Sequence, residues 1–418
     1  MARRGTGGPF ALLWAGQAIS QLGDYVALFA IPYFVFTLSQ DPLDFGLVHA
    51  GQDLPLIIFG LFSGVLLDRW SRRGWLLWAN MVQAVVFVVL ALVAEGVLPG
   101  GLWVLVLMAF VVGAMTTALQ SALYAYVPSI VAGDGLAKAN ARLSVTGQAA
   151  FIVGPVLGGL LVEQWGFLVA FGFNAITVLV AAVTALFLPT DARTEAPTKN
   201  QGIVAEALEG MRFIWDDVRL RLASVGAAAS NVVSAFMVAI LPLLAANEFA
   251  SDEPVAMSVI YGAFGVGGVI GAATGSRALE RFGLGRVFIV GLAIWGAGFA
   301  ASTFLQERIP VLIVFSLAGF GLPWVQIAFS TLRQKVTPEP MLGRVMAGTR
   351  AVVNAAYPIG AVGLTAVAAL VGSLTTSRVV SLSLIGVALV LGVGTLGQVG
   401  PNPTPMNEAA APDGTAAS

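Results

Sequence analysis

The sequence has no cysteine and a single histidine, His49, among its 418 residues. Without cysteine, disulfide bonds, thiolate catalysis and cysteine-based metal sites are excluded. One histidine does not suffice for a histidine-cluster metal site. We therefore expect neither a metal nor another cofactor.

Charge is also scarce, since Asp, Glu, Lys and Arg together make up 10% of the residues and hydrophobic residues 58%. A soluble domain carries about 25% charged residues, so this chain cannot cover itself with a water-soluble surface. The net charge of −1 gives no indication of a nucleic-acid partner. The composition instead predicts a protein whose surroundings are the lipid bilayer.

The apolar residues are grouped in long stretches along the whole chain. A helix that crosses the bilayer core needs about 20 such residues. The first stretch, 10–38, is too long for the apolar part of a signal peptide and lacks a small-residue cleavage site. We predict twelve spanning helices, at residues 10–38, 45–67, 74–95, 102–127, 138–162, 166–189, 221–246, 255–279, 284–305, 309–332, 344–371 and 376–397.

A polar segment separates two sets of six helices. We expect an N-terminal six-helix bundle at 1–189, a cytoplasmic linker at 190–220, a C-terminal six-helix bundle at 221–397 and a disordered tail at 398–418. In the linker, acidic residues alternate with Leu, Met, Phe, Ile and Trp over 203–218. This pattern is typical of an amphipathic helix at the membrane interface, and a simple tether is the open alternative.

The basic residues predict the orientation of the chain. If the N-terminus is cytoplasmic, only Arg308 and Arg378 of the 21 Lys and Arg residues fall in outer segments. Cytoplasmic loops of membrane proteins are enriched in these residues. We therefore expect both termini on the cytoplasmic side.

The two halves are similar to each other. The loop at 64–73 resembles the loop at 276–286, with Asp68 and Glu280 212 residues apart. Two further features, a Val-x-Pro type turn and a Gly/Pro-rich helix, repeat at offsets of 210 and 203 residues. Such repeats are how secondary transporters build two halves around a site at the membrane midplane.

Three stretches carry a resemblance to a known family. The opening FALLWAGQAISQLGD of residues 10–24 is similar to the first helix of bacterial drug and siderophore exporters. The loop 64–73 resembles the G-x-x-x-D-R-x-G-R-R loop of the major facilitator superfamily, with departures at Leu67 and Ser71. The stretch 154–159 resembles that superfamily's fifth-helix antiporter motif. The resemblance extends from residue 10 to about residue 397 and implies an all-α membrane fold of twelve helices in two pseudo-symmetric six-helix bundles.

Asp68 lies at the end of the second helix, beside three arginines. A carboxylate there can accept hydrogen bonds from a helix N-terminus of the other half or pair with an arginine of that half. Such a bond would exist only with the inner gate closed, so it would favour one of two global states. The alternative is that the arginines only fix the topology. The predicted gating residues are Asp68, Arg69, Arg72, Arg73, Arg344 and Arg350.

The antiporter motif consists of Gly154, Pro155, Gly158 and Gly159. Its proline predicts a kink, and its glycines give a flat face that lets another helix approach closely. We expect this face to pack against the eighth helix, which is rich in glycine between 262 and 271. An antiporter role is implied by the resemblance alone.

Asp24 and Asp53 are the two carboxylates well inside predicted spans. Buried acids in membranes are costly and usually functional. We hypothesise that Asp24, together with Asp53, binds the coupling proton or a cationic substrate. A structural hydrogen-bonding role beside Gln17 and Gln21 is the alternative for Asp24. His49 is interpreted as an interfacial residue rather than a proton relay.

Residues on the helices that border the cavity in this superfamily are candidates to line it. Aromatic side chains, methionine and a few polar groups suit an amphiphilic organic molecule. Packing or lipid contact is an equally open interpretation. The candidates are Tyr25, Phe29, Tyr33, Tyr124, Asn231, Phe236, Met237, Trp324 and Gln326.

Together these features predict a secondary active transporter that exports an amphiphilic small organic molecule in exchange for protons. The molecule would be a drug, an antibiotic or a secondary metabolite. A siderophore exporter and an importer of the same fold are alternatives. A polytopic membrane enzyme, from a different class, would need catalytic His/Asp or Ser/Lys sets inside helices, which the sequence lacks. We expect a monomer in the bacterial cytoplasmic membrane, with protons and a small-molecule substrate as partners.

Overall fold

The computed structural model describes residues 8–69, 71–131, 135–190, 203–248, 253–338, 341–394, 396 and 399–400. For some residues inside the helices only the backbone is described, and these include Asp68, Arg69 and Arg350. Apart from 399 and 400, the predicted tail at 398–418 lies outside the described residues.

The described residues form helices and no strand. The helices are α1 (Gly8–Leu38), α2 (Pro42–Arg69), α3 (Arg72–Ala94), α4 (Leu102–Ile130), α5 (Gly135–Leu186), α6 (Ile203–Asp216), α7 (Val218–Glu248), α8 (Pro254–Phe282), α9 (Leu284–Ser302), α10 (Arg308–Val336), α11 (Leu342–Asn354), α12 (Ala356–Pro358), the π-helix η2 (Ile359–Leu364), α13 (Thr365–Val371) and α14 (Ser373–Val393).

Ten helical segments of the described chain are long and apolar enough to cross a membrane. One of them, 138–186, is two spans, because Gly166 has φ 77° and breaks the helix there. Only glycine adopts such a conformation without strain. With α2 added, the described chain holds the twelve spans predicted from the sequence. The all-α membrane fold is confirmed.

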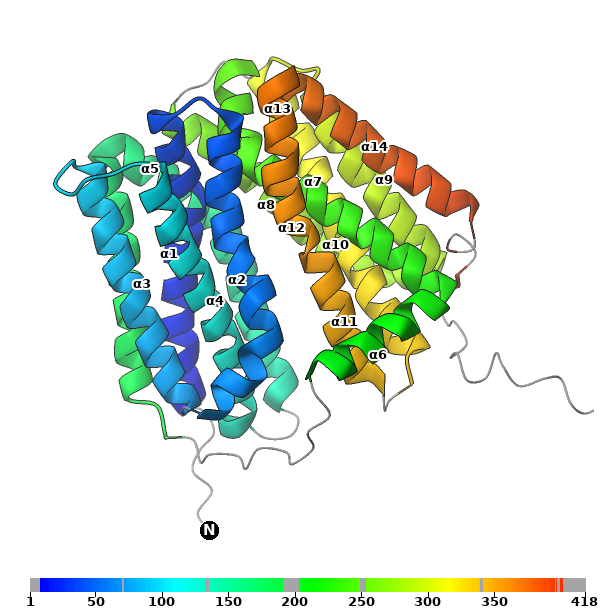
Figure 1. Ribbon diagram of the computed structural model, residues 1–418, viewed down its shortest axis with the longest axis horizontal. Helices are drawn as coiled ribbons and strands as arrows, with labels where there is room; N and C mark the ends of the chain where they lie inside the picture. The colour runs from blue at the N-terminus through cyan, green and yellow to red at the C-terminus, as the bar shows by residue number, and fades with distance from the viewer. Residues whose placement is uncertain are drawn as a thin grey trace, which may run out of the picture. The chain divides into compact units, whose positions relative to one another are not determined.

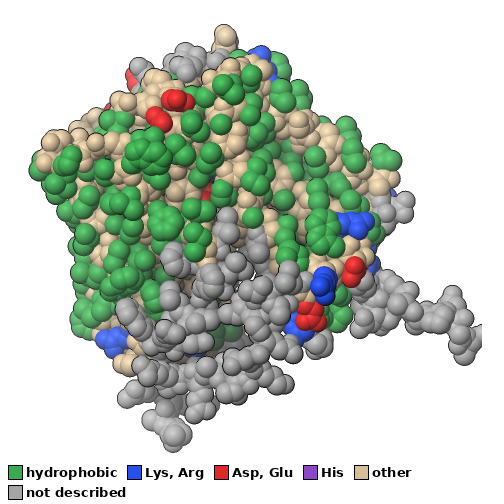
Figure 2. Space-filling model, in the orientation of Figure 1, with side chains coloured by type: hydrophobic (Ala, Val, Ile, Leu, Met, Phe, Trp, Pro, Cys, Tyr) green, Lys and Arg blue, Asp and Glu red, His purple; other side chains and the backbone are tan. Residues whose placement is uncertain are grey.

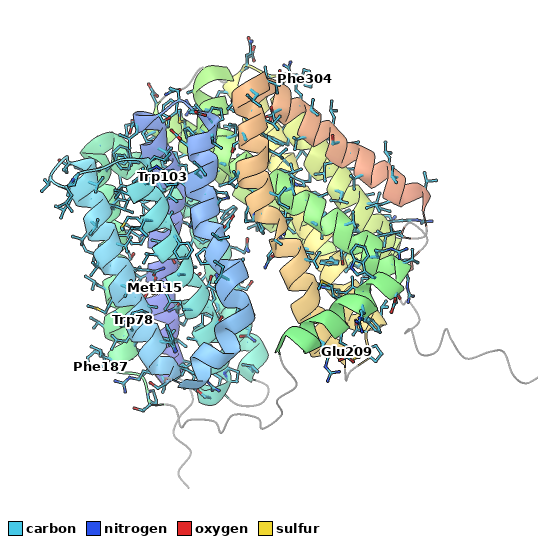
Figure 3. The ribbon with its side chains drawn as sticks, viewed as in Figure 1. Trp78, Trp103, Met115, Phe187, Glu209 and Phe304 are labelled. Atoms are coloured by element: carbon cyan, nitrogen blue, oxygen red, sulfur yellow. The ribbon has the colours of Figure 1, made fainter. Side chains whose placement is uncertain are left out.

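Apolar side chains cover the described surface. Hydrophobic groups dominate the visible face in Figure 2, and Val393 and Leu370 are 90% and 85% exposed. A helix suits such a surface, because its backbone hydrogen bonds are all internal and none has to be satisfied by lipid. Trp103 and Phe187, 72% and 74% exposed, project from the first unit near its opposite ends (Figure 3). The amphipathic ring of an exposed tryptophan is typical of a membrane interface.

The packing of the chain divides it into two compact units. The first comprises 1–198, 238–265 and 361–373, and the second comprises 199–237, 266–360 and 374–418. One boundary, between 198 and 199, falls in the predicted linker, and the others fall inside α7, α8 and η2 and at the start of α14. The predicted domains at 1–189 and 221–397 therefore stay predictions.

In the first unit, α1 to α5 lie side by side (Figure 1). Glycine allows the helices to approach closely, since a Cβ on Gly16 would meet Thr184 and one on Gly113 would meet the backbone of Gln52. An apolar cluster that includes Trp75 joins α1, α3, α4 and α5 at one end.

In the second unit, α9 packs along α10, where a Cβ on Gly298 would meet the backbone of Ala318. Trp295 is fully buried and its ring stacks on Phe299 with centroids 5.8 Å apart. α6, in the predicted linker, lies across one end of α11 (Figure 1). A Cβ on Gly210 of α6 would meet the backbone of Arg344, so α6 packs directly on α11.

Candidate transport and coupling site

Asp24 lies on α1 between two close contacts with α5. A Cβ on Gly23 would meet Thr177 and Asn174, while Tyr25 faces Gly154. These contacts fix the rotation of α1 and leave Asp24 half-buried between them. Among the described residues, no basic side chain forms an ion pair with Asp24. Its carboxyl group therefore has no oppositely charged partner in that part of the chain, and its role in coupling stays a prediction.

Asp53 lies on α2 and has His49 as its neighbour. His49 Nε2 is 3.5 Å from Asp53 Oδ2, and the two side chains are 14% and 23% exposed. Within the described residues Asp53 Oδ2 accepts no hydrogen bond. No hydrogen bond or ion pair joins Asp24 to Asp53 in that part of the chain. Asp24 on α1 and Asp53 on α2 are thus two separate acidic positions within the spans.

The aromatic side chains of α1 are packed together. Phe29 stacks on Tyr33 with ring centroids 5.4 Å apart, and Tyr25 meets Phe151 of α5 edge-to-face at 5.3 Å. Phe29 also meets Tyr261 of α8 edge-to-face at 6.1 Å. Phe29 and Tyr33 are 1% and 9% exposed. In this structure these rings hold α1 against its neighbours, and their contact with substrate stays a prediction.

The antiporter motif of α5 faces two helices. Gly154 and Gly158 lie against α1, where added Cβ atoms would meet Tyr25 and the Val26 carbonyl. Gly159 lies against Ser258 of α8. The sequence predicts only the contact with α8. The contact with α1 places these glycines against the larger residues Tyr25, Val26 and Phe29, and no pattern in α1 indicated it.

The glycines of α8 are divided between two neighbours. Cβ atoms on Gly262 and Gly265 would meet Val156 and Ile152 of α5. Those on Gly267 and Gly271 would meet the backbone of α10 instead. Only the first part of the predicted glycine face therefore lies against α5.

Glu163 provides a contact with α8 that the sequence did not predict. Its Oε2 accepts a hydrogen bond of 3.1 Å from the backbone N–H of Val255, in the first turn of α8. The N-terminus of a helix carries partial positive charge, which a carboxylate stabilises. The sequence offered only a single acidic residue near the end of a span as a signal. Its hydrogen-bond partner, Val255, lies 92 residues further along the chain.

Two of the predicted gating arginines bind helix ends inside the first unit. Arg72 Nη1 donates to the Ala125 carbonyl at 3.0 Å, and Arg73 Nε donates to the Ala185 carbonyl at 3.0 Å. Arg73 also donates to Thr190 Oγ1 at 3.1 Å. The Ala185 carbonyl lies in the last turn of α5, where carbonyl groups lack partners within the helix and basic side chains satisfy them. These arginines join α3 to α4 and α5.

A third predicted gating residue, Arg344, lies in the second unit. Its Nη1 forms an ion pair of 2.7 Å with Oε2 of Glu209 on α6, and Figure 3 labels Glu209 on that helix. The side chains of Asp68, Arg69 and Arg350 lie outside the described residues. The gating role of this set stays a prediction.

The remaining cavity candidates have varied surroundings. Asn231 Nδ2 donates to the Val353 carbonyl at 2.9 Å, and Trp324 Nε1 donates to Thr274 Oγ1 at 3.1 Å. The others are Phe236 and Met237, which are buried, and Gln326 and Tyr124, which are exposed.

The sequence is similar to curated bacterial transporters over most of its length. It is 25% identical to the uncharacterized MFS-type transporter YfiS of Bacillus subtilis, over 91% of this chain and 92% of that one. It is 24% identical to the multidrug efflux pump Tap of Mycolicibacterium fortuitum, over 84% and 87% of the two chains. With macrolide efflux protein A of Streptococcus pyogenes the identity is 23%, over 84% and 87%.

The fold is similar to those of solved transporters. The nucleoside transporter NupG matches with a TM-score of 0.76 and 12% identity, over 92% of this chain and 98% of that one. A bacterial homolog of the human lysosomal transporter Spinster matches with a TM-score of 0.70 and 12% identity, over 94% and 96%. At these identities the likeness concerns the fold alone.

The model of the Major Facilitator Superfamily matches residues 13–361. The match covers most of the chain and confirms the family resemblance drawn from the first helix, the loop at 64–73 and the stretch at 154–159. The protein is therefore a multi-pass membrane transporter rather than an enzyme, and it belongs to the Major Facilitator Superfamily.

Proposed function

We propose that this transporter exports an amphiphilic small organic molecule, such as a drug, an antibiotic or a secondary metabolite, in exchange for protons. The observation that carries the proposal is the similarity to bacterial proteins named as multidrug and macrolide efflux pumps, over more than four-fifths of the chain. Export proceeds by alternating access, in which the substrate site opens to one side of the membrane at a time.

Asp24 supports the coupling part of the proposal. It is half-buried within a span, and in the described residues no basic side chain forms an ion pair with it. A carboxyl group in such surroundings exchanges between a protonated and an ionised form at little structural cost, because no ion pair has to break. The proton and the substrate would then compete for the negative charge of the Asp24 carboxylate.

The basic residues support an orientation of the chain in the membrane. With both termini in the cytoplasm, 19 of the 21 Lys and Arg residues lie on the cytoplasmic side, as the positive-inside bias requires. We place the protein as a monomer in the bacterial cytoplasmic membrane. Asp68 and its neighbouring arginines would then form the cytoplasmic gate.

Expression in a bacterial host that lacks its own drug pumps tests this function. Cells carrying the protein should tolerate higher concentrations of erythromycin, tetracycline or ethidium than cells carrying the empty vector. Asp24→Asn should remove the tolerance at equal membrane abundance, and Asp216→Asn, on the exposed surface of α6, should not. Increased uptake of a probe by the expressing cells would instead identify an importer, and iron-dependent release of a chelator would identify a siderophore exporter.

A further inference from the structure

The single histidine of the chain lies against a carboxylate inside α2. His49 Nε2 and Asp53 Oδ2 are 3.5 Å apart, and residues four apart share one face of a helix. We propose that His49 and Asp53 form a proton-binding pair, in which His49 takes up a proton and passes it to Asp53. The role of this pair in transport rests on the proposed exchange with protons.

The geometry leaves room for one proton between the two groups. Asp53 Oδ2 is buried and accepts no hydrogen bond from the described residues. Its distance of 3.5 Å from His49 Nε2 is longer than a hydrogen bond of this kind, which is roughly 2.7–3.2 Å long. A buried carboxylate oxygen without a donor is costly when it is ionised. A proton on either group removes that cost, because a small side-chain rotation then allows one group to donate to the other.

The helices packed against α2 bring no positive charge to the pair. α4 contains no Asp, Glu, Lys, Arg or His, and its only titratable groups are Tyr124 and Tyr126. A Cβ on Gly113 of α4 would meet the Gln52 backbone, next to Asp53. The two tyrosines are at least eleven residues beyond Gly113, toward the far end of α4.

The other two neighbours of α2 in the first unit are also free of basic groups. Gly46, on the same face of α2 as Asp53, lies against Thr365 of α13, and residues 359–371 contain no titratable side chain. α1 contributes Asp24, Tyr25 and Tyr33. None of these groups is a cation that could pair with Asp53 in place of a proton.

The transfer is a simple proton movement. A hydronium ion at the start of α2 gives a proton to the His49 imidazole, which becomes an imidazolium, and a water molecule is left. The proton then passes from Nε2 to Asp53 Oδ2, which leaves a neutral imidazole and a neutral carboxylic acid. With a rise of about 1.5 Å per residue, the transfer carries the proton about one helical turn deeper. Release reverses these steps.

Nuclear magnetic resonance of the histidine tests the pair without any substrate. Because the chain has one histidine, ¹⁵N-histidine labelling of the protein in lipid nanodiscs gives the signals of His49 alone. Asp53→Asn should change the ¹⁵N signals of His49, since the carboxylate that lies 3.5 Å from Nε2 is replaced by an uncharged amide. Asp53→Glu should retain most of the wild-type signals, and Asp44→Asn, on the same helix, should leave them unchanged.

Transport by purified protein in liposomes then tests the use of the pair. With erythromycin as the probe, His49→Gln should lose uptake driven by a pH gradient and keep exchange at equal pH. A His49 signal that does not respond to Asp53→Asn, in a variant that keeps the wild-type melting temperature, would overturn the pair whatever the transport result. If the wild type transports no probe, the proposed function fails, and the resonance measurement still decides whether the pair exists.

Discussion

At the scale of single residues, charged side chains replace water as partners of backbone groups at helix ends. Arg73 binds the last turn of α5, and Glu163 binds the first turn of α8. Asp217 does the same for α7, where its Oδ1 accepts from the backbone N–H of Arg219 at 2.8 Å. Backbone groups at helix ends have no partner within the helix, so each of these side chains stabilises its helix directly.

Asp217 predicts a pH-dependent stability. Burial opposes its ionisation, but hydrogen bonds from Arg219 and Leu220 outweigh burial and hold the pKa of Asp217 below its usual range. A depressed pKa stabilises the folded state above the ordinary pKa of about 4, and that contribution is lost as the pH falls through the folded value. Asp217→Ala should therefore lower the free energy of unfolding by about 1 kcal/mol at neutral pH. Thermal unfolding in detergent at several pH values should show that the stability difference between wild type and variant shrinks in acid. Equal stability of the two proteins at neutral pH would show that Asp217 does not stabilise the start of α7.

Arg73 predicts a structural defect rather than a purely functional one. Arg73→Gln removes the bonds to the Ala185 carbonyl and Thr190 and should destabilise the first unit by about 1–2 kcal/mol. The melting temperature of the purified protein measures this, with Arg286→Gln, at an exposed position, as the control. A variant that melts like the wild type but no longer transports would indicate that Arg73 acts only in gating.

At the scale of helices, close contacts between glycine and neighbouring side chains determine how α5 packs. Gly154 has no room for a methyl group, because a Cβ there would overlap Tyr25. Gly172, on the same helix, has nothing within 4 Å of its added Cβ. Gly154→Ala should lower the melting temperature, and Gly172→Ala should leave it unchanged or raise it, since alanine favours helices by up to about 1 kcal/mol. Equal effects of the two substitutions would show that the α1 contact is not tight.

Glu163 predicts a local effect at the start of α8. Glu163→Gln keeps the size of the side chain but removes the charge that interacts with the helix N-terminus, an effect of about 0.3–1 kcal/mol. Amide hydrogen exchange should become faster in the first turn of α8, at residues 255–258, and stay unchanged in α10. Unchanged exchange in that turn would show that the hydrogen bond to Val255 contributes nothing.

At the scale of the whole molecule, local sequence patterns predicted the helices, but they did not predict which distant helices pack together. Twelve spans follow from the lengths of the apolar stretches, and Gly166 was correctly placed at a boundary between two of them. The pairing of His49 with Asp53 involves residues one turn apart and was within reach of spacing alone. The bond from Val255 to Glu163 was not, because it depends on which helix ends meet in three dimensions.

The proton exchange of the whole transporter is tested most directly in liposomes containing the purified protein. With an acidic interior and labelled erythromycin outside, protons leaving should drive the probe inward above its external concentration, and a protonophore should abolish the accumulation. Asp24→Asn should keep exchange at equal pH and lose the accumulation. Accumulation only when the exterior is acidic, or probe movement indifferent to the gradient, would contradict proton-driven export.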